Sequence, residues 1–182
     1  MLTTLVLQVE NKPGVLNRVV SLFRQRGFDI ESLSVGDTEK ACVSRMTIVV
    51  DTDEDGALRL GANLHKLVNV LCVENVTGMP SVFRDLAMIK VATTPETRAE
   101  VMQLAHVFRA TILDVDGDSM VMEATGAEDK INGLIEVLCG YGILEIARTG
   151  RVAMTRGART EAQIPARSHP DAAGDENVSY SV

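Results

Sequence analysis

Apolar and polar residues alternate over residues 2–10, and this pattern places Leu5 and Leu7 on one face. A period of two residues predicts a β-strand with one buried face. The tetrapeptide Asn-Lys-Pro-Gly at 11–14 interrupts the strand, and apolar residues then recur at helical spacing until Gly27, a residue type that ends helices. The chain therefore opens with a strand, a turn and a helix.

The same two periods predict four further elements in the first half of the chain. Residues 28–35 are predicted to form a strand whose buried parity changes near 31–32, which indicates a β-bulge. A third strand is predicted over 42–50, a helix from Asp53 onwards and a fourth strand over 70–76. The order βαββαβ is typical of a ferredoxin-like module, in which two helices cover one face of an antiparallel sheet.

The second half of the chain repeats this order after a change of composition around residues 78–81. It predicts a strand over 86–92, a helix capped by Thr94, strands over 111–115 and 120–124 around an Asp116-Gly117 turn, a helix over 131–138 and a last strand over 143–154. We therefore predict an α+β fold of two tandem ferredoxin-like βαββαβ modules, over 1–78 and 86–157, joined by a linker over 79–85. Residues 158–182 lack periodicity and are predicted to form a disordered tail.

The composition restricts the classes of partner. Lys and Arg number 18 against 25 Asp and Glu, and the net charge of -7 disfavours binding to nucleic acid or to anionic lipid. Aromatic residues make up 3% of the chain and tryptophan is absent, so platforms for stacking single-stranded bases are not expected. The sequence has no basic leader segment and no apolar run of about 20 residues, so we expect a cytoplasmic protein that does not bind membranes.

Motifs of catalytic chemistry are missing from the sequence. It contains no GxxxxGK[ST], no GxGxxG and no HExxH. Asp116-Gly117-Asp118 faintly resembles the start of a diphosphate and Mg²⁺ motif, but a chain of 182 residues is too short for the two domains that hold thiamine diphosphate, and a hairpin turn explains the segment better. The three cysteines are far apart and are expected to be buried thiols. We therefore predict no catalytic residue and no metal site.

The most informative segment is the turn at 11–14 that leads into the first predicted helix. The first turn of a helix presents unpaired backbone N–H groups and a partial positive charge, so it is suited to holding a carboxylate. Gly14 has no Cβ and lets a ligand approach the backbone, and the Asn11 amide can bond to either end of an amino acid. The same tetrapeptide is also compatible with a simple turn before a helix.

Several segments, in the same order along the chain, resemble the small subunits of acetohydroxyacid (acetolactate) synthase, which begin with an ACT domain. The resembling segments are 11–16 (NKPGVL), 22–23 (LF), 26–33 (RGFDIESL), 44–47 (SRMT), 65–70 (HKLVNV), 145–150 (EIARTG) and 156–157 (RG). The resemblance extends to residue 157 and does not cover the tail. It implies that residues 1–78 form an effector-binding ACT domain.

The resemblance implies a non-catalytic regulatory subunit that acts on a separate enzyme. Proteins of this family form homodimers, activate a thiamine-diphosphate-dependent catalytic large subunit, and confer feedback inhibition by valine, or by isoleucine or leucine, in branched-chain amino acid biosynthesis. Thiamine diphosphate, Mg²⁺ and FAD are expected only in the catalytic partner, whose holoenzyme is a transferase. No cofactor is expected in this chain.

The resemblance also assigns the effector site to the place where two ACT domains pair. The residues that it implies are Asn11, Lys12, Pro13, Gly14, Val15 and Leu16 of one chain, and Asp29 and Ile30 of its neighbour. The family pattern has asparagine where this chain has Asp29. A carboxylate there attracts an effector ammonium group or repels an effector carboxylate, so the sequence leaves the preferred effector open.

Two functions of other classes compete with this hypothesis. A free-standing, amino-acid-responsive ACT-domain regulator of transcription needs a helix-turn-helix and a basic face, and neither is predicted. An independent small enzyme needs a set of catalytic residues that the sequence does not provide. We therefore expect a regulatory binding subunit.

Overall fold

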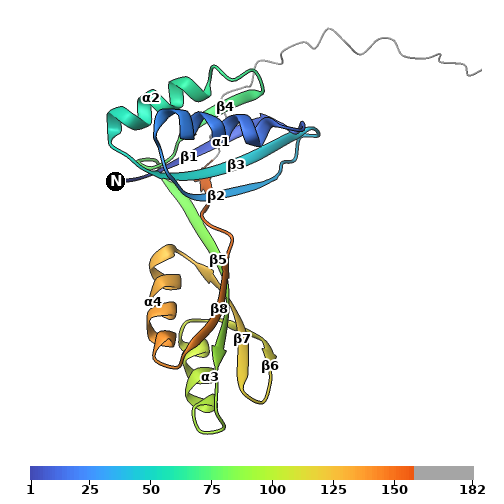
Figure 1. The fold of residues 1–182 in the computed structure, drawn as a ribbon, viewed down its shortest axis with the longest axis vertical. Coiled ribbons are helices and arrows are strands. Elements are labelled where there is room, and N and C mark those ends of the chain that lie inside the picture. The colour runs from blue at the N-terminus through green and yellow to red at the C-terminus, as the bar shows by residue number, and fades with distance from the viewer. Residues whose placement is uncertain (158–182) are drawn as a thin grey trace, which may run out of the picture.

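The fold consists of two modules arranged along one long axis (Figure 1). The computed structural model describes residues 1–157. The first module contains β1 (Leu2–Glu10), α1 (Val15–Arg26), β2 (Ile30–Asp37), β3 (Val43–Asp51), α2 (Glu54–Leu64) and β4 (Val70–Asn75). Its antiparallel sheet has the order β2-β3-β1-β4, and both helices lie on one face of that sheet.

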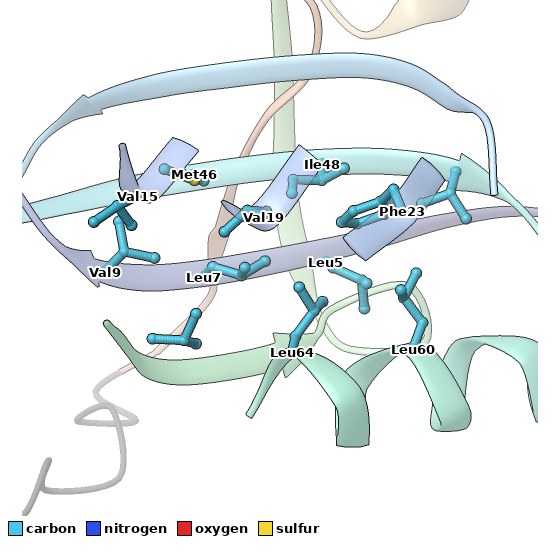
Figure 2. Close-up of a cluster of buried hydrophobic side chains, with 12 residues drawn as sticks. Leu5, Leu7, Val9, Val15, Val19, Phe23, Met46, Ile48, Leu60 and Leu64 are labelled. Carbon is cyan, nitrogen blue, oxygen red and sulfur yellow. The ribbon is translucent and has the colours of Figure 1, made fainter. Parts of the chain in front are cut away.

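The core of the first module lies between its sheet and its two helices. Figure 2 shows the buried side chains that meet there, among them Leu5, Leu7, Val9, Val15, Val19, Phe23, Met46, Ile48, Leu60 and Leu64. Burial of one such side chain contributes roughly 1.5–3 kcal/mol by removing apolar surface from water. α1 ends at Gly27, whose φ of 72° is readily adopted by glycine and lets its N–H group donate to the Arg24 carbonyl.

The second module has the same topology as the first. It contains β5 (Ser81–Ala92), α3 (Arg98–Val107), β6 (Thr111–Val115), β7 (Ser119–Gly126), α4 (Glu128–Cys139) and β8 (Ile143–Arg148), and is followed by β9 (Val152–Thr155). Its main path of paired strands has the order β6-β7-β5-β8. The predicted α+β class with two tandem ferredoxin-like modules is therefore confirmed.

The helix predicted to be capped by Thr94 begins later than expected, at Arg98. Thr94 still closes the turn that precedes the helix. Its Oγ1 accepts a hydrogen bond from the Thr97 N–H group (3.3 Å), and its carbonyl accepts one from the Arg98 N–H group (2.9 Å). The hydrogen-bond pattern of a helix start thus extends one turn before α3.

Residues 81–85, predicted to be a linker, instead form the beginning of β5. This strand runs from the first module into the second, pairing first with β9 and then with β7 and β8 (Figure 1). The single strand predicted over 143–154 is divided into β8 and β9 at Thr149-Gly150-Arg151, where Gly150 has a φ of 77°. Local composition suggested a linker because it does not reveal pairing between segments about 70 residues apart.

Strands cover the face of the first sheet that lies opposite its helices. Val6 points to this face and packs with Phe83 of β5 and Ala153 of β9. Nη2 of Arg45 donates to the Ala153 carbonyl (3.0 Å). As a result β1 is buried on both faces, and every residue from Thr3 to Val9 is buried.

Three remaining expectations concern residues outside the cores. The cysteines are not buried as predicted, because Cys42 and Cys139 are exposed and Cys72 is half-buried. Within residues 1–157, no helix has the length and apolar character needed to cross a membrane. The predicted tail, 158–182, lies outside the described residues.

Candidate functional site

The turn between β1 and α1 is exposed, and its conformation depends on Gly14. Five of the six residues predicted here are exposed, while Val15 is buried in the core. Gly14 is the N-cap of α1 and has a φ of 81°, which lies in the left-handed region that favours glycine. A Cβ placed on Gly14 meets no atom within 4 Å, so backbone conformation, and not crowding, selects glycine at this position.

Within residues 1–157, the start of α1 lacks the side chains that usually satisfy a helix N-terminus. The helix has no side-chain cap and no acidic residue in its first turn, whereas Arg24 and Arg26 lie in its last turn. Basic residues at the C-terminal end interact favourably with the partial negative charge of the helix dipole. The partial positive charge at the N-terminal end has no acidic residue of the first turn beside it. The first turn of α1 can therefore accept a carboxylate from outside the chain.

A network of polar side chains fixes the base of this turn. Oε2 of Glu10 accepts a hydrogen bond from Nδ2 of Asn69 (2.6 Å) and pairs with Nζ of Lys12 (3.1 Å). Oδ1 of Asn69 accepts a hydrogen bond from Nη1 of Arg18 on α1. The network thus joins the end of β1, the turn, α1 and the residue before β4.

Of these network residues, the sequence predicts a functional role only for Lys12. Glu10 is the last residue of the strand predicted over 2–10, Asn69 lies within a resembling segment, and no sequence pattern assigns a role to Arg18. The one local feature that could have indicated the network is an acidic residue, Glu10, at the end of a strand and two residues before Lys12. Its partner Asn69 lies 59 residues away, and that pairing requires the folded sheet.

Asn11 is held against the connection between β2 and β3. Its backbone N–H group donates to the Cys42 carbonyl (2.8 Å), and its Nδ2 donates to Oδ1 of Asp37 (3.4 Å). Within residues 1–157 the amide oxygen of Asn11 has no hydrogen-bond donor. It is therefore available to an external donor such as an ammonium group.

The other two predicted residues, Asp29 and Ile30, lie at the opposite end of α1. Asp29 is exposed and borders a hollow of about 350 Å³, while Ile30 packs on the core of the first module. α1 has 12 residues, and at 1.5 Å per residue its ends are about 18 Å apart. A single chain therefore does not bring the two halves of the predicted effector site together.

The sequence places two histidines inside predicted helices, where surface histidines greatly outnumber metal ligands and general bases. His65 and His106 are exposed on the surface. Among the described residues, no three His, Cys, Asp or Glu side chains converge closely enough to hold a metal ion. The turn at Gly14 thus has the geometry expected of the predicted carboxylate-binding site.

Two tandem ferredoxin-like modules, the first with an exposed turn at the start of its first helix, place the chain in the class of ACT-domain proteins. A family model described as "AHAS small subunit-like ACT domain" matches residues 5–72. A second model, described as "Small subunit of acetolactate synthase", matches residues 84–157. The two matches correspond to the two modules of the structure.

Similar proteins agree with these matches. A protein of Archaeoglobus fulgidus named "Probable acetolactate synthase small subunit" is 50% identical, over 85% of this chain and 96% of its own length. The acetolactate synthase small subunit of Bacillus subtilis is 46% identical, over 87% of this chain and 92% of its own. The crystal structure of the small subunit from Thermotoga maritima has a TM-score of 0.81 and 38% identity, covering 86% of this chain and 98% of that one. The chain belongs to the acetolactate synthase small subunit family.

Proposed function

We propose that this chain activates the catalytic large subunit of acetolactate synthase and makes it sensitive to feedback inhibition by valine or a related branched-chain amino acid. Its family membership supports the regulatory role. The observation that carries the effector proposal is the uncapped start of α1 at Gly14, where an exposed helix end lacks any acidic residue. The Val15 N–H group bonds to the Lys12 carbonyl (3.3 Å), so an effector carboxylate binds there through the N–H groups of Leu16 and Asn17 and the partial positive charge of the helix start.

The remaining parts of a branched-chain amino acid fit the other half of the proposed site. The hollow beside Asp29 is also lined by Arg24 and Gly27, and its apolar part matches a branched aliphatic side chain; this part consists of Val20, Phe23, Phe28 and Ile30. The exposed carboxylate of Asp29 matches the effector ammonium group, because charge-assisted hydrogen bonds are stronger than neutral ones. The proposed site thus contains one feature for each part of the effector.

The distance between these halves favours a homodimer as the binding unit. One amino acid is much shorter than the roughly 18 Å between the two ends of α1. Within residues 1–157, β2 and β4 are the edge strands of the first sheet, and edge strands commonly pair with a second copy. A two-fold arrangement in which the Gly14 turn of one chain meets Asp29 of its partner would complete two equivalent sites.

The catalytic groups belong, in this proposal, to the large subunit. Thiamine diphosphate, Mg²⁺ and FAD bind there, and this chain changes the activity of that cytoplasmic transferase through a protein interface. Valine inhibits because it binds more tightly to one arrangement of the subunits than to another, since an effector without such a preference shifts no equilibrium.

Calorimetric titration of valine into the purified chain tests effector binding directly. We expect saturable binding by the wild-type chain and at least a tenfold loss of affinity, or about 1.4 kcal/mol, for Gly14→Asp. Isoleucine and leucine serve as the comparison ligands. No binding of any of the three amino acids, by the chain alone and by the reconstituted holoenzyme, would contradict the proposed function.

A further inference from the structure

Arg151 lies where the two modules meet. It follows Gly150 in the connection between β8 and β9, and its side chain is 20% exposed. Its backbone N–H group donates to Oγ of Ser32 on β2 (3.1 Å), and its Nη1 donates to Oγ1 of Thr4 on β1 (2.8 Å). A residue of the β8–β9 connection therefore holds two strands of the first module.

The guanidinium of Arg151 is also anchored in the second module. Its Nη2 forms an ion pair with Glu128 in the first turn of α4, and its Cζ lies 5.3 Å from the centre of the Phe83 ring. A planar guanidinium can stack on a ring and donate several hydrogen bonds at once, which a lysine ammonium does less well. Because Thr4 is fully buried, the bond from Arg151 also satisfies a hydroxyl that has no access to water.

Ser32 connects this junction to the proposed effector site. A β-bulge between Ile30 and Ser32 sends their side chains to opposite faces of the sheet. Ile30 packs on the helix side, whereas Ser32 lies opposite Val49 on the face that Arg151 contacts. Gly150 fits closely here, since a Cβ on it would lie 3.0 Å from Oγ of Ser32. Ser32 therefore joins the start of β2 directly to the β8–β9 connection.

A cleft of about 420 Å³ lies beside the junction. Both modules line it, the first with Leu2 and Glu31 and the second with Arg84 and Asp85. Close-packed interiors resist displacement because any movement meets other side chains. The open cleft instead leaves room for the second module to change its orientation about Arg151.

We propose that Arg151 is the positioning residue that couples effector binding at the start of β2 to the orientation of the second module. The inference rests on the proposed effector site and extends it by naming the contact through which the second module responds. An effector that holds Asp29 and Ile30 fixes the bulge, the bulge fixes Ser32, and Ser32 fixes the backbone of Arg151. The effector stabilises the orientation in which these contacts form, because a ligand favours the state that it binds more tightly.

Five variants separate this coupling from simple support of the fold. Ser32→Ala removes the acceptor for the Arg151 N–H group, Ser32→Thr keeps it, and Arg151→Met removes the guanidinium while keeping an apolar stem. Ser34→Ala is the control on the same face of β2, because the Ser34 side chain bonds to nothing in the second module within residues 1–157. Arg84→Met is the second control, since Arg84 lines the same cleft but its Nη1 donates to the neighbouring Phe83 carbonyl (2.8 Å).

Each full-length variant is reconstituted with the catalytic large subunit and measured in three ways. The measurements are the calorimetric Kd for valine, the valine concentration that gives half-inhibition, and hydrogen exchange of amides 149–155 with and without valine. In the wild type, Ser32→Thr and both controls, we expect valine to slow this exchange at least about threefold. In Ser32→Ala and Arg151→Met, we expect Kd to change less than about threefold, the slowing to disappear, and the half-inhibitory concentration to rise about tenfold.

Three other results overturn the proposal. If Ser32→Ala and Arg151→Met show the same hydrogen exchange and the same inhibition by valine as the wild type, the contact carries no coupling. Joint loss of valine binding, activation and inhibition in these variants shows that the contact only supports the fold. Failure of the wild-type chain to bind valine contradicts the proposed function itself, and the calorimetric Kd distinguishes this result from the other two.

Discussion

Ile30 and Ser32 are two residues apart in β2 and nevertheless face opposite sides of the first sheet. Residues i and i+2 share a face in a regular strand, so the β-bulge at Glu31 is the cause. It leaves Ile30 in the core, next to the proposed effector contact, and turns Ser32 toward Arg151. One local irregularity therefore links the effector half-site to the boundary between the modules.

Replacing Gly14 with aspartate tests the proposed carboxylate-binding site at the start of α1. The new carboxylate lies at the uncapped start of α1, where it occupies the N–H groups and repels an effector carboxylate. We expect the half-inhibitory valine concentration of the reconstituted holoenzyme to rise at least about tenfold while activation of the catalytic subunit survives.

Gly14→Asn is the matched control for this experiment. Asparagine has nearly the same shape as aspartate and is among the residues that best tolerate a positive φ, but it carries no charge. We expect it to keep most of the valine sensitivity. Equal loss in both variants would assign the effect to shape, and unchanged inhibition in Gly14→Asp would place the effector elsewhere.

Asp29→Asn tests the position at which this chain departs from the family pattern. If Asp29 contacts the effector ammonium group, the change removes a charged hydrogen bond worth about 1.5–3 kcal/mol. We then expect valine sensitivity to weaken by roughly ten- to a hundredfold, as shown by dose–response curves at equal saturation of the catalytic subunit. Increased sensitivity to valine would place Asp29 near the effector carboxylate. Superimposable curves would show that Asp29 does not contact the effector.

The separation of the two proposed half-sites predicts an oligomeric state that can be measured. We expect sedimentation of the purified chain at micromolar concentration to show a homodimer, because two chains are needed to bring the Gly14 turn next to Asp29 and because β2 lies at an edge of the first sheet. A monomer under these conditions, with valine present, would exclude a site built from two chains.

Gly150→Ala tests how closely the modules fit at their junction. Alanine at a φ of 77° costs about 1–2 kcal/mol for the left-handed conformation alone. Its Cβ also lies 3.0 Å from Oγ of Ser32, so the contact must open. Gly27→Ala has a similar φ of 72° and an empty neighbourhood, and it measures the conformational cost by itself.

We expect thermal unfolding, followed by circular dichroism, to show a larger fall in Tm for Gly150→Ala than for Gly27→Ala. A loss of 1 kcal/mol lowers Tm by about 2–4 °C in a chain of this size. Equal falls in the two variants would show that the contact between Gly150 and Ser32 contributes nothing to stability.

The helices and strands of this fold were predictable because they depend on the spacing of apolar residues within short segments. The change of parity near 31–32 predicted the observed bulge, and Asp116-Gly117 predicted the hairpin between β6 and β7. These signals arise from which side chains share a face and from which residues adopt a turn, and both are properties of short segments.

The junction and the polar network were not predictable in the same way. Arg151 bonds to Thr4, 147 residues away, and Arg18 bonds to Asn69, 51 residues away. An arginine between two strands has the same local appearance whether it is solvated or buried between modules. The strand pairing of residues 81–85 was missed for the same reason, because the partner strand β9 lies about 70 residues further along the chain.

Formation of acetolactate from pyruvate tests the central claim most directly. The rate is measured for this chain alone, for the catalytic large subunit alone and for the reconstituted complex, each with and without valine. We expect no turnover by this chain, a higher rate for the complex than for the catalytic subunit alone, and a fall in the rate of the complex when valine is added. A complex whose rate equals that of the catalytic subunit, and that responds to none of valine, isoleucine and leucine, would contradict a regulatory role for this chain.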